Sequence, residues 1–193
     1  PGFIVNRLFI PLVHEACYVM ERQKIQQTEI DSAVKFRLGF PMGIFELADF
    51  TGLDVIHKAT VEMHTRDKKV ILPHPTIEQL FNEKKLGQKS GEGFYKYSDD
   101  KYERIPLSEE LAQKCDPVQI IANILNNAAW LVTNNASDID EIEKAANLGL
   151  GLKKPLFDTA KEIGMQKIVD ELKQLSKKHG TFYEPDPLLL SMC

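Results

Sequence analysis

The sequence predicts an all-α protein made of two similar helical units. Apolar residues recur at helical spacing through most of the chain, and several segments open with a capping residue and close with glycine or proline. No segment of any length has the alternating pattern typical of a strand-rich fold. Of the 193 residues, 43% are hydrophobic and 27% are charged, which is ordinary for a globular protein with a buried core.

The composition excludes several functional classes. The formal net charge is −4, so there is no basic excess with which to bind nucleic acid. The longest apolar run is too short to span a membrane, and the N-terminal residues lack the pattern of a secretory signal. Cys17, Cys115 and Cys193 cannot all pair within the chain and lack the spacing of metal ligands, so we expect reduced thiols in a cytoplasmic protein.

The histidines do not predict a metal site either. His57 and His64 lie seven positions apart on one expected helix, which separates them by about 10 Å along its axis. That distance is too great for one ion, and we expect no bound metal.

The first element is a long helix from Phe3 to Glu21, introduced by the Pro1-Gly2 pair. Its residues are apolar on most sides, which is typical of a helix buried between partners. Pro11 lies inside it and is expected to kink it.

Three more helices are expected between residues 28 and 66. Thr28 should cap "TEIDSAVKFRLGF", which Gly39 should end. The segment "MGIFELADFTGLD" predicts a short helix that ends near Gly52, and residues 54–66 continue with a helical pattern.

The rest of the chain is expected to form one helix, then a loop, and then further helices. "HPTIEQLFNEKKLG" predicts a helix with Thr76 as its cap and Gly87 as its stop, and residues 87–106, rich in glycine and aromatic residues, predict a loop or short hairpin. Asp116 should cap the helix that follows, with Pro117 at its first position. The last helices are expected in "SDIDEIEKAANLG", "PLFDTAKEIG" and "MQKIVDELKQLSKKHG".

The two halves follow one order of elements, which indicates an internal repeat. "IFELADFTGLDVI" and "LFDTAKEIGMQKI" share four positions at one constant offset: Phe45/Phe157, Ala48/Ala160, Gly52/Gly164 and Ile56/Ile168. We therefore divide the chain into a first unit at 1–97, a linker at 98–115 and a degenerate second copy at 116–193. The alternative is that helical proteins share such patterns by accident.

The residues alone indicate no self-sufficient catalytic centre. The Rossmann fingerprint, the phosphate-binding loop and the serine-nucleophile motif are all absent. Asn6 is the one unusual residue, an amide on a largely apolar helix. Its side chain could hydrogen-bond a neighbouring backbone group, or it could orient a carbonyl ligand at the edge of the domain.

Several linked motifs nevertheless resemble one family. "PGFIVNRL", "HEA", "EIDSAVKFRLGFPMGIFELADFTGLD" and "LGQKSGEGFYKY" together resemble the C-terminal domain of the L-3-hydroxyacyl-CoA dehydrogenases, which include 3-hydroxybutyryl-CoA dehydrogenases. The resemblance is close over residues 1–97. The second half is similar to the degenerate copy in the multifunctional fatty-acid oxidation proteins, and the fold implied is like the C-terminal domain of 6-phosphogluconate dehydrogenase.

The resemblance implies an activity divided between domains. Such enzymes oxidise (3S)-3-hydroxyacyl-CoA to 3-oxoacyl-CoA with NAD during fatty-acid β-oxidation, and an N-terminal Rossmann domain holds NAD and the His-Glu acid–base pair. We expect that domain to precede Pro1, so this chain alone should be inactive. Asn6 corresponds to the family's Asn of "VNR", which orients the substrate carbonyl.

Pro41, Met42 and Gly43 resemble the segment that lines the family's acyl-CoA site, and they could equally be a simple helix break. The family commonly has proline where Ile44 stands. The second copy has no "VNR", since Gln119 or a neighbour takes the place of Asn6, and we expect that copy to be structural.

The resemblance also names partners. These are an acyl-CoA substrate, the protein's own Rossmann domain, and either a homodimer partner or the second copy packed within the chain. Two other functions stay open, a non-catalytic dimerisation module and a dehydrogenase of another hydroxy acid.

Overall fold

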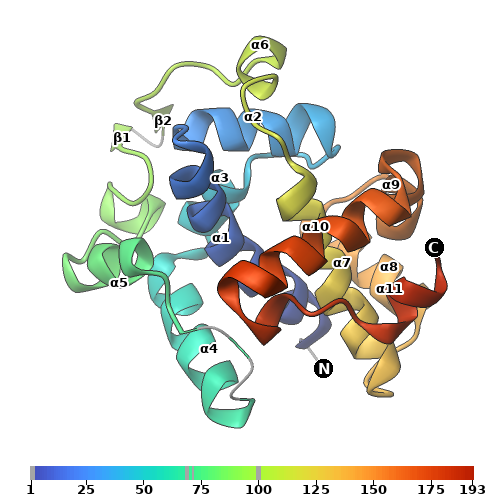
Figure 1. The fold of residues 1–193 in the computed structure, drawn as a ribbon. Coiled ribbons are helices and arrows are strands. Elements are labelled where there is room, and N and C mark those ends of the chain that lie inside the picture. The colour runs from blue at the N-terminus through green and yellow to red at the C-terminus, as the bar shows by residue number, and fades with distance from the viewer. Residues whose placement is uncertain (1–2, 68–69, 71, 99–100) are drawn as a thin grey trace.

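The computed structural model describes residues 3–67, 70, 72–98 and 101–193, and it confirms the all-α class (Figure 1). Two short strands, β1 (Tyr97–Ser98) and β2 (Lys101–Tyr102), pair antiparallel in the predicted hairpin region. The 3-10 turns are η1 (Gln88–Ser90) and η2 (Thr181–Tyr183). The α-helices are α1 (Phe3–Gln23), α2 (Gln27–Arg37), α3 (Ile44–Thr51), α4 (Leu53–Arg66), α5 (Pro75–Asn82), α6 (Glu109–Ala112), α7 (Val118–Thr133), α8 (Ile139–Leu150), α9 (Leu156–Ile163), α10 (Met165–His179) and α11 (Pro187–Ser191).

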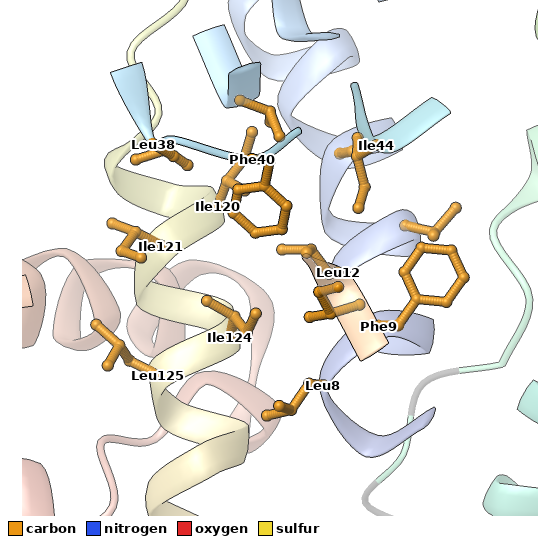
Figure 2. Packing of buried hydrophobic residues seen from close by; sticks show 14 of the residues in the cluster. Leu8, Phe9, Leu12, Leu38, Phe40, Ile44, Ile120, Ile121, Ile124 and Leu125 are labelled. Atoms are coloured by element: carbon orange, nitrogen blue, oxygen red, sulfur yellow. The ribbon is translucent and has the colours of Figure 1, made fainter. Parts of the chain in front are cut away.

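The two long apolar helices α1 and α7 lie side by side at the centre of the molecule (Figure 1). Leu8 and Leu12 face Ile120 and Ile124 across their interface, and all four side chains are fully buried (Figure 2). Helix α1 also packs against α2, α3, α4 and α8, which explains why it is apolar on most sides. It continues as an α-helix through Pro11.

Two predicted caps in the first half were wrong. Helix α2 is capped by Gln26 and not Thr28, because the carboxylate of Glu29 accepts the Gln26 backbone N–H at 2.7 Å. Helix α5 is capped by His74 and not Thr76, since His74 Nδ1 accepts the Thr76 N–H at 3.2 Å. Histidine is not among the residues that usually cap helices, so the sequence pattern did not predict this cap. Helix α5 also ends at Asn82, five residues before Gly87.

The predicted stops at Gly39 and Gly52 are confirmed, whereas the N-cap of α7 is Pro117 and not Asp116. Gly39 follows α2 with φ of 77°, and Gly52 separates α3 from α4 with φ of 99°. Asp116 accepts the Val118 N–H at 3.1 Å, although Pro117 stands just before the helix and not at its first position. Asp138 caps α8 through the Glu141 N–H at 2.8 Å.

Helices α8, α9 and α10 repeat the order of α2, α3 and α4. Gly164 matches Gly52 with φ of 102°, and Gly151 matches Gly39 with φ of 69°. The common origin of the halves and the division at 97/98 and 115/116 stay predictions. Helix α6, inside the expected linker, packs on α2 and so extends the first unit (Figure 1).

A carboxylate holds the N-terminus of the short helix in each half. Asp31 on α2 accepts the N–H groups of Phe45 at 2.9 Å and Glu46 at 3.1 Å. Glu143 on α8 accepts those of Leu156 at 2.7 Å and Phe157 at 2.9 Å. Each carboxylate stabilises the positive end of a helix dipole and satisfies two otherwise unpaired donors.

Among the described residues, no helix is both long enough and apolar enough to cross a membrane. The three cysteines are free thiols, with Cys17 and Cys115 buried and Cys193 exposed. The cytoplasmic location stays a prediction.

We predict that Glu143→Ala lowers the free energy of unfolding by about 1.5–3 kcal/mol, because two backbone donors at the start of α9 lose a charged acceptor. The matched control is Glu141→Ala, two residues away on α8, whose exposed carboxylate lies 3.9 Å from Lys144. That change should cost less than about 1 kcal/mol. Urea denaturation measures both, and equal losses would contradict the capping role.

Candidate functional site

Asn6 lies near the N-terminus of α1, just before the helix enters the core. Its neighbour Leu8 is fully buried, whereas Asn6 is exposed. Within the described residues its amide has no hydrogen-bond partner, so it does not serve a neighbouring backbone group. The amide is therefore free to bind a ligand, the second of the two roles the sequence left open.

Asn6 lines a cavity of about 440 Å³ between α1, the C-terminal half of α4 and the end of α7. Its apolar wall consists of Ala59, Met63, Trp130, Leu131 and Ala136.

The charged groups of this cavity form two ion pairs. Arg7 Nη2 lies 3.2 Å from Asp67 Oδ2, and Arg66 Nη2 lies 2.7 Å from Glu62 Oε1. The Arg7 guanidinium also stacks on Trp130, 3.9 Å from the ring centroid. The cavity thus combines an apolar wall, internally neutralised charges and one free amide.

The structure does not place Pro41, Met42 and Gly43 in this cavity. They connect α2 to α3, with Pro41 exposed, Met42 half-buried and Gly43 buried. A Cβ on Gly43 would lie 2.1 Å from Cγ of Asp31, and a Cβ on Gly151 would lie 2.8 Å from Cγ of Pro41. These close contacts support the helix-break interpretation, and acyl-CoA contact by this segment stays a prediction.

The "GEGFYKY" segment folds around a second buried carboxylate, Asp49 on α3. Asp49 accepts the backbone N–H groups of Phe94 and Tyr95, each at 2.9 Å, and the Tyr97 hydroxyl at 2.8 Å. A Cβ on Gly93 would lie 2.2 Å from the Asp49 carboxylate, so this position requires glycine.

Tyr95 joins this segment to the α3 cap, because its hydroxyl donates to Asp31 Oδ2 at 2.8 Å. Burial raises the pKa of Asp31 to about 7, against the opposing effect of its backbone donors. Among the described residues, no group of histidine, cysteine and carboxylate side chains could hold a metal ion. The carboxylate network therefore holds the fold together and does not form a metal centre.

Comparison with known proteins identifies the first half. Residues 2–97 match the family model described as "3-hydroxyacyl-CoA dehydrogenase, C-terminal domain". This segment belongs to the 3-hydroxyacyl-CoA dehydrogenase family. It includes Asn6, the buried carboxylates and the hairpin.

The mitochondrial hydroxyacyl-coenzyme A dehydrogenases of Rattus norvegicus and Homo sapiens are each 46% identical to this chain over 99 residues. The match covers 50% of this chain and 32% of theirs, so the chain matches about a third of the length of these relatives.

Two solved structures share the fold of nearly the whole chain. Escherichia coli 3-hydroxybutyryl-CoA dehydrogenase aligns with 100% of this chain and 59% of its own, with a TM-score of 0.79 and 21% identity. The dehydrogenase part of multifunctional enzyme 1 from Caenorhabditis elegans aligns with 98% of this chain and 47% of its own, with a TM-score of 0.70 and 18% identity. The arrangement of both halves therefore recurs in these two structures.

The described residues offer no nucleotide-binding unit for the family's NAD. Their only strands are the two-residue β1 and β2, whereas a Rossmann site needs a parallel sheet with a glycine-rich turn into a helix. NAD does not fit this part of the protein.

Asn6 is the one residue of this cavity lining that the sequence predicted as part of the site. Three of the residues that it missed, Trp130, Leu131 and Ala136, lie in the second half, outside the segment that matches the family. Trp130 is the only tryptophan of the 193 residues, and this was the one feature of the sequence that could have drawn attention to it as a site residue. At the place predicted to correspond to Asn6, Gln119 donates to Glu171 Oε1 at 2.8 Å, so the second-half amide is used inside the fold.

His14 and Glu15, adjacent on α1, have hydrogen-bond partners on different elements. Glu15 accepts hydrogen bonds from Arg22 at 2.8 Å and from the Tyr183 hydroxyl at 2.7 Å. On the other side, His14 Nδ1 accepts the His74 N–H at 3.1 Å, so Nε2 carries the proton and donates to Thr60 at 2.7 Å. Burial lowers the pKa of His14 to about 3. Histidine 14 is therefore a neutral structural residue and not an acid–base group.

The lowered pKa of His14 predicts a pH-dependent stability. An unfolded histidine takes up a proton below about pH 6.5 and the folded one does not, so this part of the stability is complete above pH 6.5 and is lost as pH falls toward 3. We expect His14→Gln to flatten the pH dependence of the unfolding free energy between pH 6.5 and 4 by up to about 1.4 kcal/mol per pH unit.

Thr60→Val is the matched control, because it breaks the same hydrogen bond without removing the titrating ring. It should lower stability at every pH and keep the wild-type slope. Urea titrations at several pH values measure this, and a wild-type slope in His14→Gln would contradict the assignment.

Proposed function

We propose that this chain is the substrate-binding and assembly region of an NAD-dependent (3S)-3-hydroxyacyl-CoA dehydrogenase. The reaction converts a 3-hydroxyacyl-CoA to the 3-oxoacyl-CoA of fatty-acid β-oxidation. NAD accepts the hydride when bound, on a Rossmann domain outside the residues described here. The chain alone is inactive on this proposal.

The observation that carries the proposal is the amide of Asn6, which lies at the edge of an apolar cavity and has no hydrogen-bond partner in the described part of the chain. An amide N–H can donate to the carbonyl oxygen of a thioester or of the 3-oxo product, which holds the reacting carbon in place and stabilises charge that develops on the oxygen. The cavity beside it can receive apolar substrate atoms. Its charged residues are paired with one another, so they do not compete for the carbonyl.

The packing of α1 on α7 supports assembly within one chain. The second half covers the first along the long helix α1, and Leu8 and Leu12 are completely removed from solvent. This favours the intramolecular alternative over a homodimer that uses the same face.

We predict that Asn6→Ala lowers kcat/KM of the complete gene product by about 100-fold or more, the usual effect of removing one carbonyl-oxygen donor. Because Asn6 is exposed and unpartnered, the melting temperature should stay within about 2 °C of the wild-type value. The assay follows NAD reduction with 3-hydroxybutyryl-CoA.

Asn82→Ala is a matched control, since Asn82 is also an exposed amide on a helix. It should keep full activity. Unchanged turnover in Asn6→Ala would remove Asn6 from the mechanism, and an inactive wild-type protein across acyl chain lengths would favour the non-catalytic scaffold.

A further inference from the structure

The cavity beside Asn6 is built by both halves of the chain. Helices α1 and α4 supply Asn6 and Met63, whereas Trp130, Leu131 and Ala136 come from the end of α7 and the turn after it. A unit consisting of residues 1–97 alone would leave the cavity without its aromatic wall. The second half therefore does more than cover the core.

The charges and the apolar residues that line the cavity indicate which class of ligand it can bind. A phosphate or carboxylate would need an unpaired cation, but the two cations among the described lining residues are paired, Arg7 with Asp67 at 3.2 Å and Arg66 with Glu62 at 2.7 Å. Met63 and Trp130 offer adaptable apolar surface, which suits a flexible hydrocarbon chain. At about 440 Å³, the cavity falls in the size range of ordinary ligand pockets.

We propose that this cavity binds the distal acyl chain of the substrate, with Asn6 at the carbonyl end and Trp130 as the wall that sets the preferred chain length. This proposal rests on the proposed function, because it assumes that the thioester lies beside Asn6. It assigns a direct role in substrate selection to residues outside the family match.

Trp130 makes the proposal measurable without turnover, because it is the only tryptophan in the 193 residues. The 193-residue chain is titrated with CoA, acetyl-CoA, butanoyl-CoA and octanoyl-CoA while Trp130 fluorescence is recorded. We expect a saturable change with octanoyl-CoA and none with CoA. Affinity should rise by up to about fourfold for each added methylene, the usual gain from burying a CH₂ group.

Ala136→Phe is the blocking variant, since it places a ring at a solvent-exposed part of the cavity wall. It should weaken octanoyl-CoA binding at least tenfold. Thr65→Phe is the matched control, because Thr65 is exposed on α4 but does not line the cavity. It should bind like the wild type, and far-UV circular dichroism should show all three proteins folded.

The complete gene product gives a second readout. Ala136→Phe should lower kcat/KM for 3-hydroxyoctanoyl-CoA at least threefold more than it lowers kcat/KM for 3-hydroxybutyryl-CoA. Equal loss on both substrates, no loss on either, or a Trp130 signal that does not saturate would overturn the acyl-chain site. A signal present in the 193-residue chain and absent from the complete product would overturn it in favour of a further domain that covers the cavity.

Failure of this proposal and failure of the proposed function are distinguishable. Oxidation of 3-hydroxybutyryl-CoA without a Trp130 response keeps the dehydrogenase and overturns the cavity assignment. A saturable Trp130 response that Ala136→Phe weakens in the 193-residue chain, combined with a complete protein that lacks dehydrogenase activity, supports the acyl-chain site and overturns the dehydrogenase.

Discussion

The packing of α1 against α7 is the interaction on which the rest of the structure depends. Burying Leu8, Leu12, Ile120 and Ile124 contributes about 1.5–3 kcal/mol for each side chain, so this one interface contributes as much as the net stability of a typical domain. Neither helix could leave its apolar face in water. The same contact fixes the first turns of α1, and with them Asn6, relative to the end of α7, so the geometry of the site follows from the core.

Buried carboxylates provide the second constraint. Asp31 and Asp49 are almost completely removed from solvent, a placement that is costly unless every oxygen is hydrogen-bonded. Four backbone N–H groups and two tyrosine hydroxyls satisfy them. Much of the segment that resembles the family most strongly therefore holds the hairpin on α3. A family motif can be specific and still be structural.

The sequence predicted most helices well because their signals are local. Helical spacing located α1 and α7, and glycine with positive φ marked the ends of α2 and α3. Three features that the sequence did not reveal share one cause, because each depends on contacts between distant elements. The His74 cap of α5 depends on a ring buried by distant helices, and the Asp31 cap of α3 crosses between two elements. The cavity wall at Trp130 depends on two halves meeting, which no local pattern records.

The two amides at the starts of the long helices have different surroundings. In the second half, Gln119 is held by Glu171 on α10 and helps to fasten that helix. In the first half, Asn6 is exposed and has no hydrogen-bond partner among the described residues, although a hydrogen bond within the fold would satisfy it. The second half lacks "VNR" but still contributes to the cavity, because the end of α7 supplies Trp130 and Leu131. The same helix therefore covers α1 and completes the cavity.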